Sequence, residues 1–112
     1  MPNIRTLARK PRAAVMTVEA MTPHAEQAAT LLRALANEQR LMILCNLAGG
    51  ELSVGELNER VPLSQSALSQ HLAVLRECGI VTTRRSGQTV HYSLADGPAS
   101  RVVETLHEIY CA

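Results

Sequence analysis

Three cysteines are the side chains of this sequence best suited to chemistry, and their positions favour a conditional reaction over a permanent disulfide. The number of cysteines is odd, and no two of them stand in a Cys-x-x-Cys pair or at the spacing of a metal finger. They are Cys45, Cys78 and Cys111. The pattern argues against a secreted disulfide framework, and we expect a cytoplasmic protein. His107 stands four residues before Cys111, a spacing that places both side chains on one face of a helix.

These residues complete neither a metal site nor the machinery of a thiol enzyme. His107 and Cys111 are two ligands, which do not make a tetrahedral site, so we expect no metal and no cofactor. A thiol enzyme needs an activated cysteine, a base and a substrate pocket, and only His107 suggests any of these, so we expect no enzymatic activity. A metal sensor that uses His107 and Cys111 with ligands from a second subunit stays open as an alternative.

Length and composition predict one helical domain. The chain has 112 residues, it lacks Phe and Trp, and its only aromatic side chains are two tyrosines, so its core must be aliphatic. The shortage of aromatics argues against readers of single-stranded nucleic acid, which stack bases on aromatic rings. The longest apolar run has five residues. A membrane helix needs about 18 or more, so we expect no membrane partner.

Residues 1–22 are expected to form a flexible basic tail, and residues 23–112 the folded domain. The tail holds four basic side chains against one acidic side chain and shows no sustained apolar period. Thr17 interrupts its one apolar stretch, which argues against a signal peptide.

Apolar residues at helical spacing predict two helices at the start of this domain. The first is expected over residues 23–36 with Thr22 as its N-cap, and the second begins after Asn37 and ends at Gly49. Cys45 falls in the apolar stripe of the second helix, so we expect its thiol to be buried. That stripe consists of Leu41, Leu44, Cys45 and Ala48.

Two further helices, joined by a few residues, make a helix-turn-helix candidate. A short helix capped by Ser53 stops at Pro62, and the next begins at Ser64 and ends at Gly79.

A β-hairpin and a final helix complete the predicted fold. Residues 80–85 and 88–94 are rich in strand-forming side chains around a Ser86-Gly87 turn, and a last helix is expected over residues 99–111. The order ααααββα predicts a mainly α protein with a β-hairpin wing, a winged helix-turn-helix.

The fourth helix and the hairpin carry side chains suited to double-stranded DNA. Leucines occupy one face of the helix, and small or amide side chains, which major-groove entry requires, occupy the other. The segment from Arg60 to His91 has a net charge of +3, whereas the whole chain has +1. A protein-interaction module that does not bind DNA stays open as an alternative. The predicted DNA-binding residues are Ser64, Gln65, Ser66, Ser69, Gln70, His71, Arg76, Arg84, Arg85 and Gln88.

The sequence resembles a known family over the stretch from Leu31 to Tyr92. The blocks LLRALANEQRLMILCNL, ELSVGEL and SQSALSQHLAVLRECG are similar to those of the ArsR family of homodimeric bacterial repressors. The resemblance implies a symmetric dimer whose first and last helices form the interface. It also implies that two recognition helices enter successive major grooves of a palindromic operator, roughly 34 to 36 Å apart.

The thiols resemble those of one branch of that family. The arsenic-sensing motif ELCVCDL is replaced here by ELSVGEL, residues 51–57, and the zinc-binding spacings are absent. Cys45 in ILC and Cys111 in HEIYC are similar to the cysteines of persulfide- and redox-sensing repressors of the SqrR, BigR and HlyU kind. By this resemblance the inducer is a persulfide or polysulfide, and a bridge between Cys45 and Cys111 releases the repressor from DNA.

The order of the reaction and the nature of the inducer are further hypotheses. Cys111 is expected to be exposed and to attack first, with Cys45 resolving the adduct. Reactive oxygen species that form a simple disulfide are the alternative inducer. Cys78 has no counterpart in that branch, and we expect it to be a small packed residue.

Overall fold

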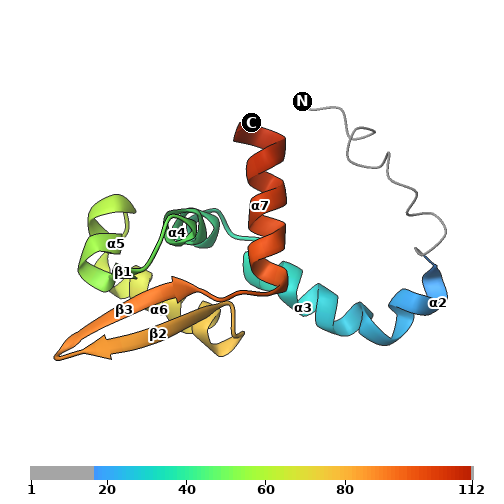
Figure 1. Cartoon of the computed structure of the whole chain (residues 1–112), viewed down its shortest axis with the longest axis horizontal. Coiled ribbons are helices and arrows are strands. Elements are labelled where there is room, and N and C mark those ends of the chain that lie inside the picture. The colour runs from blue at the N-terminus through green and yellow to red at the C-terminus, as the bar shows by residue number, and fades with distance from the viewer. Residues whose placement is uncertain (1–16, 112) are drawn as a thin grey trace.

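The computed structural model describes residues 17–111 and shows a mainly helical chain with a small antiparallel sheet (Figure 1). The predicted order is confirmed, with two short helical segments at the start and one short strand added. In chain order the elements are α2 (Val18–Met21), η1 (Thr22–His24), α3 (Ala25–Leu35), α4 (Glu38–Ala48), β1 (Leu52–Ser53), α5 (Val54–Arg60), α6 (Gln65–Glu77), β2 (Val81–Ser86), β3 (Thr89–Leu94) and α7 (Pro98–Cys111).

Helical structure begins earlier than the sequence suggested. The Thr17 side chain accepts a hydrogen bond from the backbone N–H of Ala20 at 3.0 Å and caps α2. Thr22 lies inside the helical stretch, where its hydroxyl donates to the carbonyl of Val18 at 2.7 Å. The prediction that Thr22 caps the first helix is therefore wrong, because its hydroxyl bonds backward to the preceding turn. The greater part of the predicted tail, residues 1–16, lies outside the described residues.

Helix α4 begins and ends where predicted but buries a different face. The Asn37 side chain accepts from the N–H of Arg40 at 3.0 Å, and the helix ends at Gly49. Its buried side chains are Ile43, Leu44 and Leu47, whereas Cys45 is exposed. The expected burial of Cys45 is wrong, because nearly every residue from 41 to 48 is apolar and the spacing alone does not identify the inner face.

Helices α5 and α6 match their predicted bounds and packing. The hydroxyl of Ser53 accepts from the N–H of Glu56, and the Glu56 carboxylate accepts from the N–H of Ser53, which together form a capping box. Ser64 caps α6, and Gly79, with φ of +72°, ends it in the left-handed conformation. The core-facing side chains of α6 are Leu68, Leu72 and Leu75, all nearly inaccessible.

The sheet has the order β1-β3-β2, in which β1 is a strand that the sequence did not predict. Strands β2 and β3 are antiparallel, and Ser86 pairs with Thr89. The turn therefore consists of Gly87 and Gln88, one residue later than predicted. Gly87 has φ of +63° while no non-glycine in the described part of the chain has positive φ, a combination that fits a type II′ turn.

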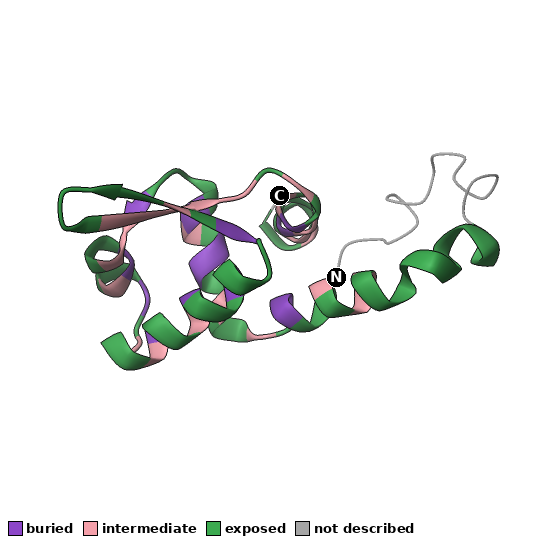
Figure 2. Cartoon of the chain, turned by 90° about the horizontal axis from the view of Figure 1, so that it is seen from below, coloured by how far each residue is buried: buried purple, intermediate pink, exposed green. Residues whose placement is uncertain are grey.

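The core lies between the sheet, α4, α6 and the inner side of α7 (Figure 2). It is entirely aliphatic, and no charged or polar side chain among residues 17–111 is buried. Helix α2 and the first part of α3 project away from this core as an arm, while Ala34 and Leu35 at the end of α3 are buried in it (Figure 1). No helix within the described range is long and apolar enough to cross a membrane.

Candidate nucleic-acid interface and thiol pair

The turn between α5 and α6 holds the two helices in a helix-turn-helix arrangement. The Asn58 side chain donates to the carbonyl of Leu63 at 2.8 Å, and the N–H of Leu63 bonds to the carbonyl of Val61 at 2.8 Å. Val61 is buried, which anchors the turn in the core. Asn58 is a structural residue that was not predicted, although an amide four residues before a proline is a recognisable partner for a turn carbonyl.

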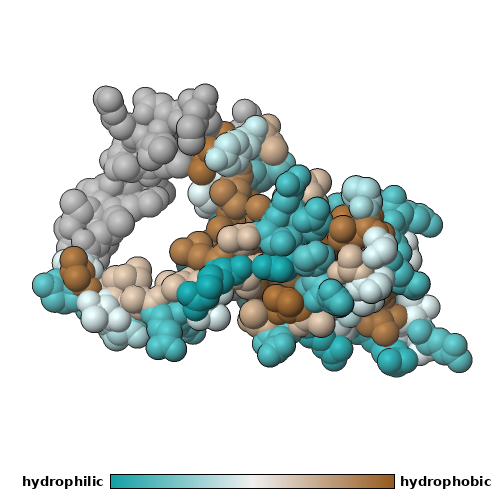
Figure 3. Space-filling view, turned by 180° about the vertical axis from the view of Figure 1, so that it is seen from behind, coloured by the Kyte–Doolittle hydropathy of each residue, from teal (hydrophilic) through white to brown (hydrophobic). Residues whose placement is uncertain are grey.

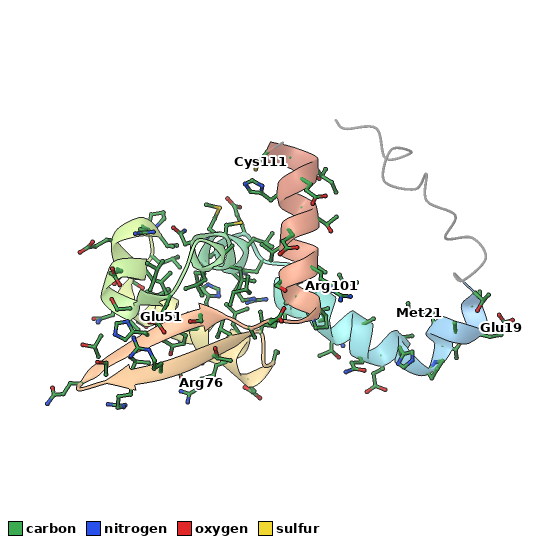
Figure 4. The ribbon with its side chains drawn as sticks, viewed as in Figure 1. Glu19, Met21, Glu51, Arg76, Arg101 and Cys111 are labelled. Carbon is green, nitrogen blue, oxygen red and sulfur yellow. The ribbon has the colours of Figure 1, made fainter. Side chains whose placement is uncertain are left out.

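The outer face of α6 is polar and exposed, as predicted. Because the three leucines occupy the inner face, the small and amide side chains turn to solvent. The Ser64 hydroxyl accepts from the N–H of Ala67 at 3.1 Å, so it is committed to starting the helix. Figure 4 shows Arg76 below the strands. The exposed predicted residues on this helix are Gln65, Ser66, Ser69, Gln70 and Arg76.

The two arginines of the wing have different surroundings. The Arg84 guanidinium donates to both carboxylate oxygens of Glu51, with Nη2 at 2.7 Å and Nε at 3.1 Å. The bond to Arg84 holds the pKa of Glu51 below its usual value, and the nearby His91 contributes to the same shift. Within residues 17–111 the structure shows no such partner for Arg85. Gln88 is exposed in the turn at the wing tip.

His71 lies at the flank of α6, away from the exposed polar face. It is half-buried, and its Nδ1 stands 3.5 Å from Nη1 of Arg40. The structure thus places His71 against α4, 31 residues earlier in the chain. A contact of His71 with DNA stays a prediction.

Cys45 lies on α4 and Cys111 at the end of α7, and these two helices pack on each other. Both residues are exposed, and Figure 4 shows Cys111 at the end of α7 that points away from the strands. Burial of the sulfur, first, and then the negative charge of the Cys111 thiolate raise the pKa of Cys45. The Cys45 thiol is thus partly desolvated by neighbouring atoms even though the residue as a whole reaches solvent. Because the charge of Cys111 acts on Cys45 through space, the two thiols lie within electrostatic range of each other.

The third cysteine and the possible metal ligands were the remaining candidates for chemistry. Cys78 is the C-cap residue of α6 and is exposed. The expectation that it is a packed residue is therefore wrong. Among residues 17–111 no group of three or more His, Cys, Asp or Glu side chains is arranged to hold a metal ion.

Comparison with known proteins agrees with this geometry. A family model described as bacterial regulatory protein, arsR family, matches residues 37–83. The transcriptional activator HlyU of Vibrio cholerae is 51% identical over 100 residues, which cover 89% of this chain and 93% of that protein. A solved structure of reduced HlyU from Vibrio cholerae has a TM-score of 0.79 at 52% identity, covering 85% of this chain and 100% of that one.

A second structure supports the same fold. The crystal structure of the transcriptional repressor BigR from Xylella fastidiosa has a TM-score of 0.80 at 45% identity, covering 87% of this chain and 99% of that one. These likenesses confirm the predicted winged helix-turn-helix.

Proposed function

Since this chain belongs to the ArsR family of bacterial regulatory proteins, we propose that it is a repressor that binds a palindromic operator as a homodimer and is released when Cys45 and Cys111 become bridged. That it is a transcriptional regulator and not an enzyme follows from the family. The site of action would be the cytoplasm. The single observation that supports the sensing mechanism is that Cys45 and Cys111 stand on two packed helices, α4 and α7, within electrostatic range of each other.

The proposed DNA surface combines the outer face of α6 with the tip of the wing. Amide side chains of Gln65 and Gln70 can pair with adenine in the major groove, and serine hydroxyls can serve several bases. Arg76 and Arg85 are exposed and would bind phosphates. Ser66, Ser69 and Gln88 complete this surface, while Ser64 sets the start of the helix.

The proposed dimer covers apolar side chains that the single chain leaves in water. Val18, Met21 and Leu32 are more than half exposed on the arm, and Tyr110 is 67% exposed near the end of α7. Figure 3 shows apolar atoms along the arm and up α7. A second copy is the occupant that fits, because the resemblance to the ArsR family implies a dimer joined through the first and last helices, and the arm and α7 are those helices in the described chain. A symmetric interface would place the two α6 helices on one side of the dimer.

The proposed reaction uses the exposed thiol first. The Cys111 thiolate attacks the outer sulfur of an organic persulfide RSSH and breaks its S–S bond. The outer sulfur stays on Cys111, which becomes a persulfide, and the RS– group leaves as the thiol RSH after taking a proton. The Cys45 thiolate then attacks the inner sulfur of that persulfide, forms a disulfide and releases hydrogen sulfide. If both cysteines become persulfides first, their condensation gives a trisulfide and one hydrogen sulfide.

The raised pKa of Cys45 supports this order, because a smaller fraction of Cys45 is thiolate at neutral pH. A disulfide requires Cα atoms about 4.4 to 6.8 Å apart, and a bridge with an extra sulfur tolerates a wider gap. Hydrogen peroxide, the alternative inducer, would oxidise Cys111 to a sulfenic acid that Cys45 converts to the disulfide with loss of water.

The test compares inducers on protein bound to an operator selected from a pool of palindromic DNA. Fluorescence anisotropy would measure release by cysteine persulfide, hydrogen peroxide and oxidised glutathione, and mass spectrometry would identify the bridged peptides. We expect Cys45→Ser and Cys111→Ser to stay bound and Cys78→Ser, the matched control, to be released like the wild type.

Two results would contradict the proposal. One is release of the Cys45→Ser protein by persulfide at the wild-type concentration. The other is release by zinc alone that His107→Ala abolishes, which would establish the metal sensor instead. Sedimentation of the reduced protein as a monomer at concentrations that bind the operator would contradict the homodimer.

A further inference from the structure

One arginine joins three helices of this fold. Arg40 lies in the first turn of α4, and its guanidinium reaches the end of α3 and the flank of α6. Its Nε donates to the carbonyl of Ala34 at 2.6 Å, and its Nη2 donates to the carbonyl of Arg33 at 3.2 Å. Its Nη1 stands 3.5 Å from Nδ1 of His71. The three nitrogens of the guanidinium are thus divided between α3 and α6.

The two carbonyl bonds close the C-terminal end of α3. The last carbonyls of a helix have no partner within it, and the end of the helix dipole is negative. A cation that donates two hydrogen bonds there satisfies both requirements. Arg40 is therefore fixed by α3. Because the guanidinium is planar and rigid, its Nη1, which faces α6, has a defined position.

At 3.5 Å the third nitrogen can donate a hydrogen bond to the histidine in only one of the ring's tautomers. Arginine has no acceptor and keeps its proton, so a hydrogen bond to Nδ1 requires that Nδ1 carry no proton. The neutral ring then has its proton on Nε2. His71 is half-buried on the flank of α6, while the side chains suited to bases lie on the exposed face.

We infer that Arg40 and His71 form a positioning contact that holds the recognition helix α6 at a fixed orientation on the end of α3. In this role His71 acts on operator binding through Nδ1 and Arg40, and it does not touch DNA. The inference rests on the proposed function only in that α3 belongs to the dimer interface. If so, the contact sets how each recognition helix stands relative to the dimer axis.

The contact has a consequence for the operator. Two recognition helices bind well only when their separation matches one helical turn of DNA. Loosening α6 from α3 broadens the range of separations, so the preference for one half-site spacing weakens together with the affinity. A residue that merely stabilises the fold would not change the spacing preference.

Three substitutions of His71 distinguish the positioning role from contact with DNA. The oxygen of asparagine stands close to where Nδ1 of histidine lies, and the oxygen of glutamine stands close to where Nε2 lies, so the two amides are matched controls for each other. His71→Leu offers no acceptor. We expect His71→Asn to bind the operator like the wild type. We expect His71→Gln and His71→Leu to bind about tenfold more weakly.

The experiment measures anisotropy on operators whose half-sites are moved apart or together by one base pair. We expect the penalty for the wrong spacing to shrink in His71→Leu and to persist in His71→Asn. Circular dichroism melting of each variant separates loss of the contact from loss of the fold. In a double substitution, His71→Leu is expected to add nothing to the effect of Arg40→Gln. Because Arg40 also closes α3, the His71 series alone decides the question if Arg40→Gln does not fold.

Opposite outcomes overturn the inference. Tight binding by His71→Gln together with weak binding by His71→Asn would mean that Nε2 contacts DNA. Equal binding by all three variants, or equal weakening with an unchanged spacing preference, would also refute the positioning contact. Failure of the wild type to bind any selected operator would instead refute the proposed function.

Discussion

Arg84 and Arg85 are neighbours on β2, and we predict that replacing them changes operator binding very differently. The Arg84 guanidinium is held in two hydrogen bonds by the carboxylate of Glu51, at 2.7 and 3.1 Å. Its positive charge is compensated before DNA arrives. Successive side chains of a strand point to opposite faces, so Arg85 leaves the sheet on the other side, where no ion pair within residues 17–111 involves it.

The difference appears in the dependence of affinity on salt. Each phosphate contact releases condensed counterions and adds about 0.9 to the slope of log K against log salt. A dimer carries two copies of every residue, so Arg85→Ala should reduce the slope by about 1.8. Between 50 and 200 mM salt this corresponds to a factor of about twelve in the relative loss of affinity. Arg84→Ala should change the slope by less than about 0.5, since its charge is already neutralised.

Anisotropy titrations of the reduced protein at four salt concentrations measure both slopes. Arg85→Lys is the matched control, because it keeps the charge and should keep the slope. Basic residues in the first 16 positions contribute equally to every variant and cancel from the difference. An equal fall in slope for Arg84→Ala and Arg85→Ala would refute the reasoning, since it would show that Glu51 releases Arg84 when DNA binds.

Three further predictions concern the scaffold and the thiols. Leu72→Ala should lower the free energy of unfolding by about 3 kcal/mol, because its side chain is 1% exposed in the core, and urea denaturation measures this. Gly79→Ala should cost about 1 kcal/mol through its φ of +72°, while Gly55→Ala in α5, which meets only Ser53 Oγ at 3.9 Å, should gain stability; melting curves that do not separate the two would contradict the assignment of strain. The rate at which iodoacetamide labels Cys45 should reach its midpoint at a higher pH than for an ordinary thiol, because the pKa of Cys45 is raised. Cys111→Ser should move that midpoint to lower pH, since the thiolate charge is removed while the burial remains. An unchanged midpoint in that variant would show that the charge of Cys111 does not act on Cys45.

Local signals in the sequence were enough where several of them agreed. In α6 the serine cap, the leucine spacing and the terminal glycine all indicated the same helix, and the structure has it within one residue. In α4 they did not agree. Seven apolar side chains lie between positions 41 and 48, so more than one face could be buried, and packing against α6, α7 and β3 decided that Cys45 remains exposed.

The partners of the charged side chains were beyond the reach of local signals. Glu51 and Arg84 are 33 positions apart, and Arg40 and His71 are 31 positions apart. β1 joins β3 through only two residues, too few to show a strand period. Only β1 places Glu51 beside Arg84, and no local signal predicts β1. The charge counted between residues 60 and 91 therefore included Arg84, whose charge Glu51 compensates.

The position of α4 connects the thiols to the recognition helix. Under the proposed mechanism, a bridge between two thiols introduces no new charged group, so release from DNA must come from a change in geometry. Cys45 lies five residues after Arg40 on the same helix, about 7.5 Å along its axis. A bridge that draws Cys45 toward Cys111 therefore moves the residue that holds His71 on α6. By this route, His71→Leu should weaken operator binding in the reduced protein. The further loss of affinity on bridging should then be smaller in His71→Leu than in the wild type.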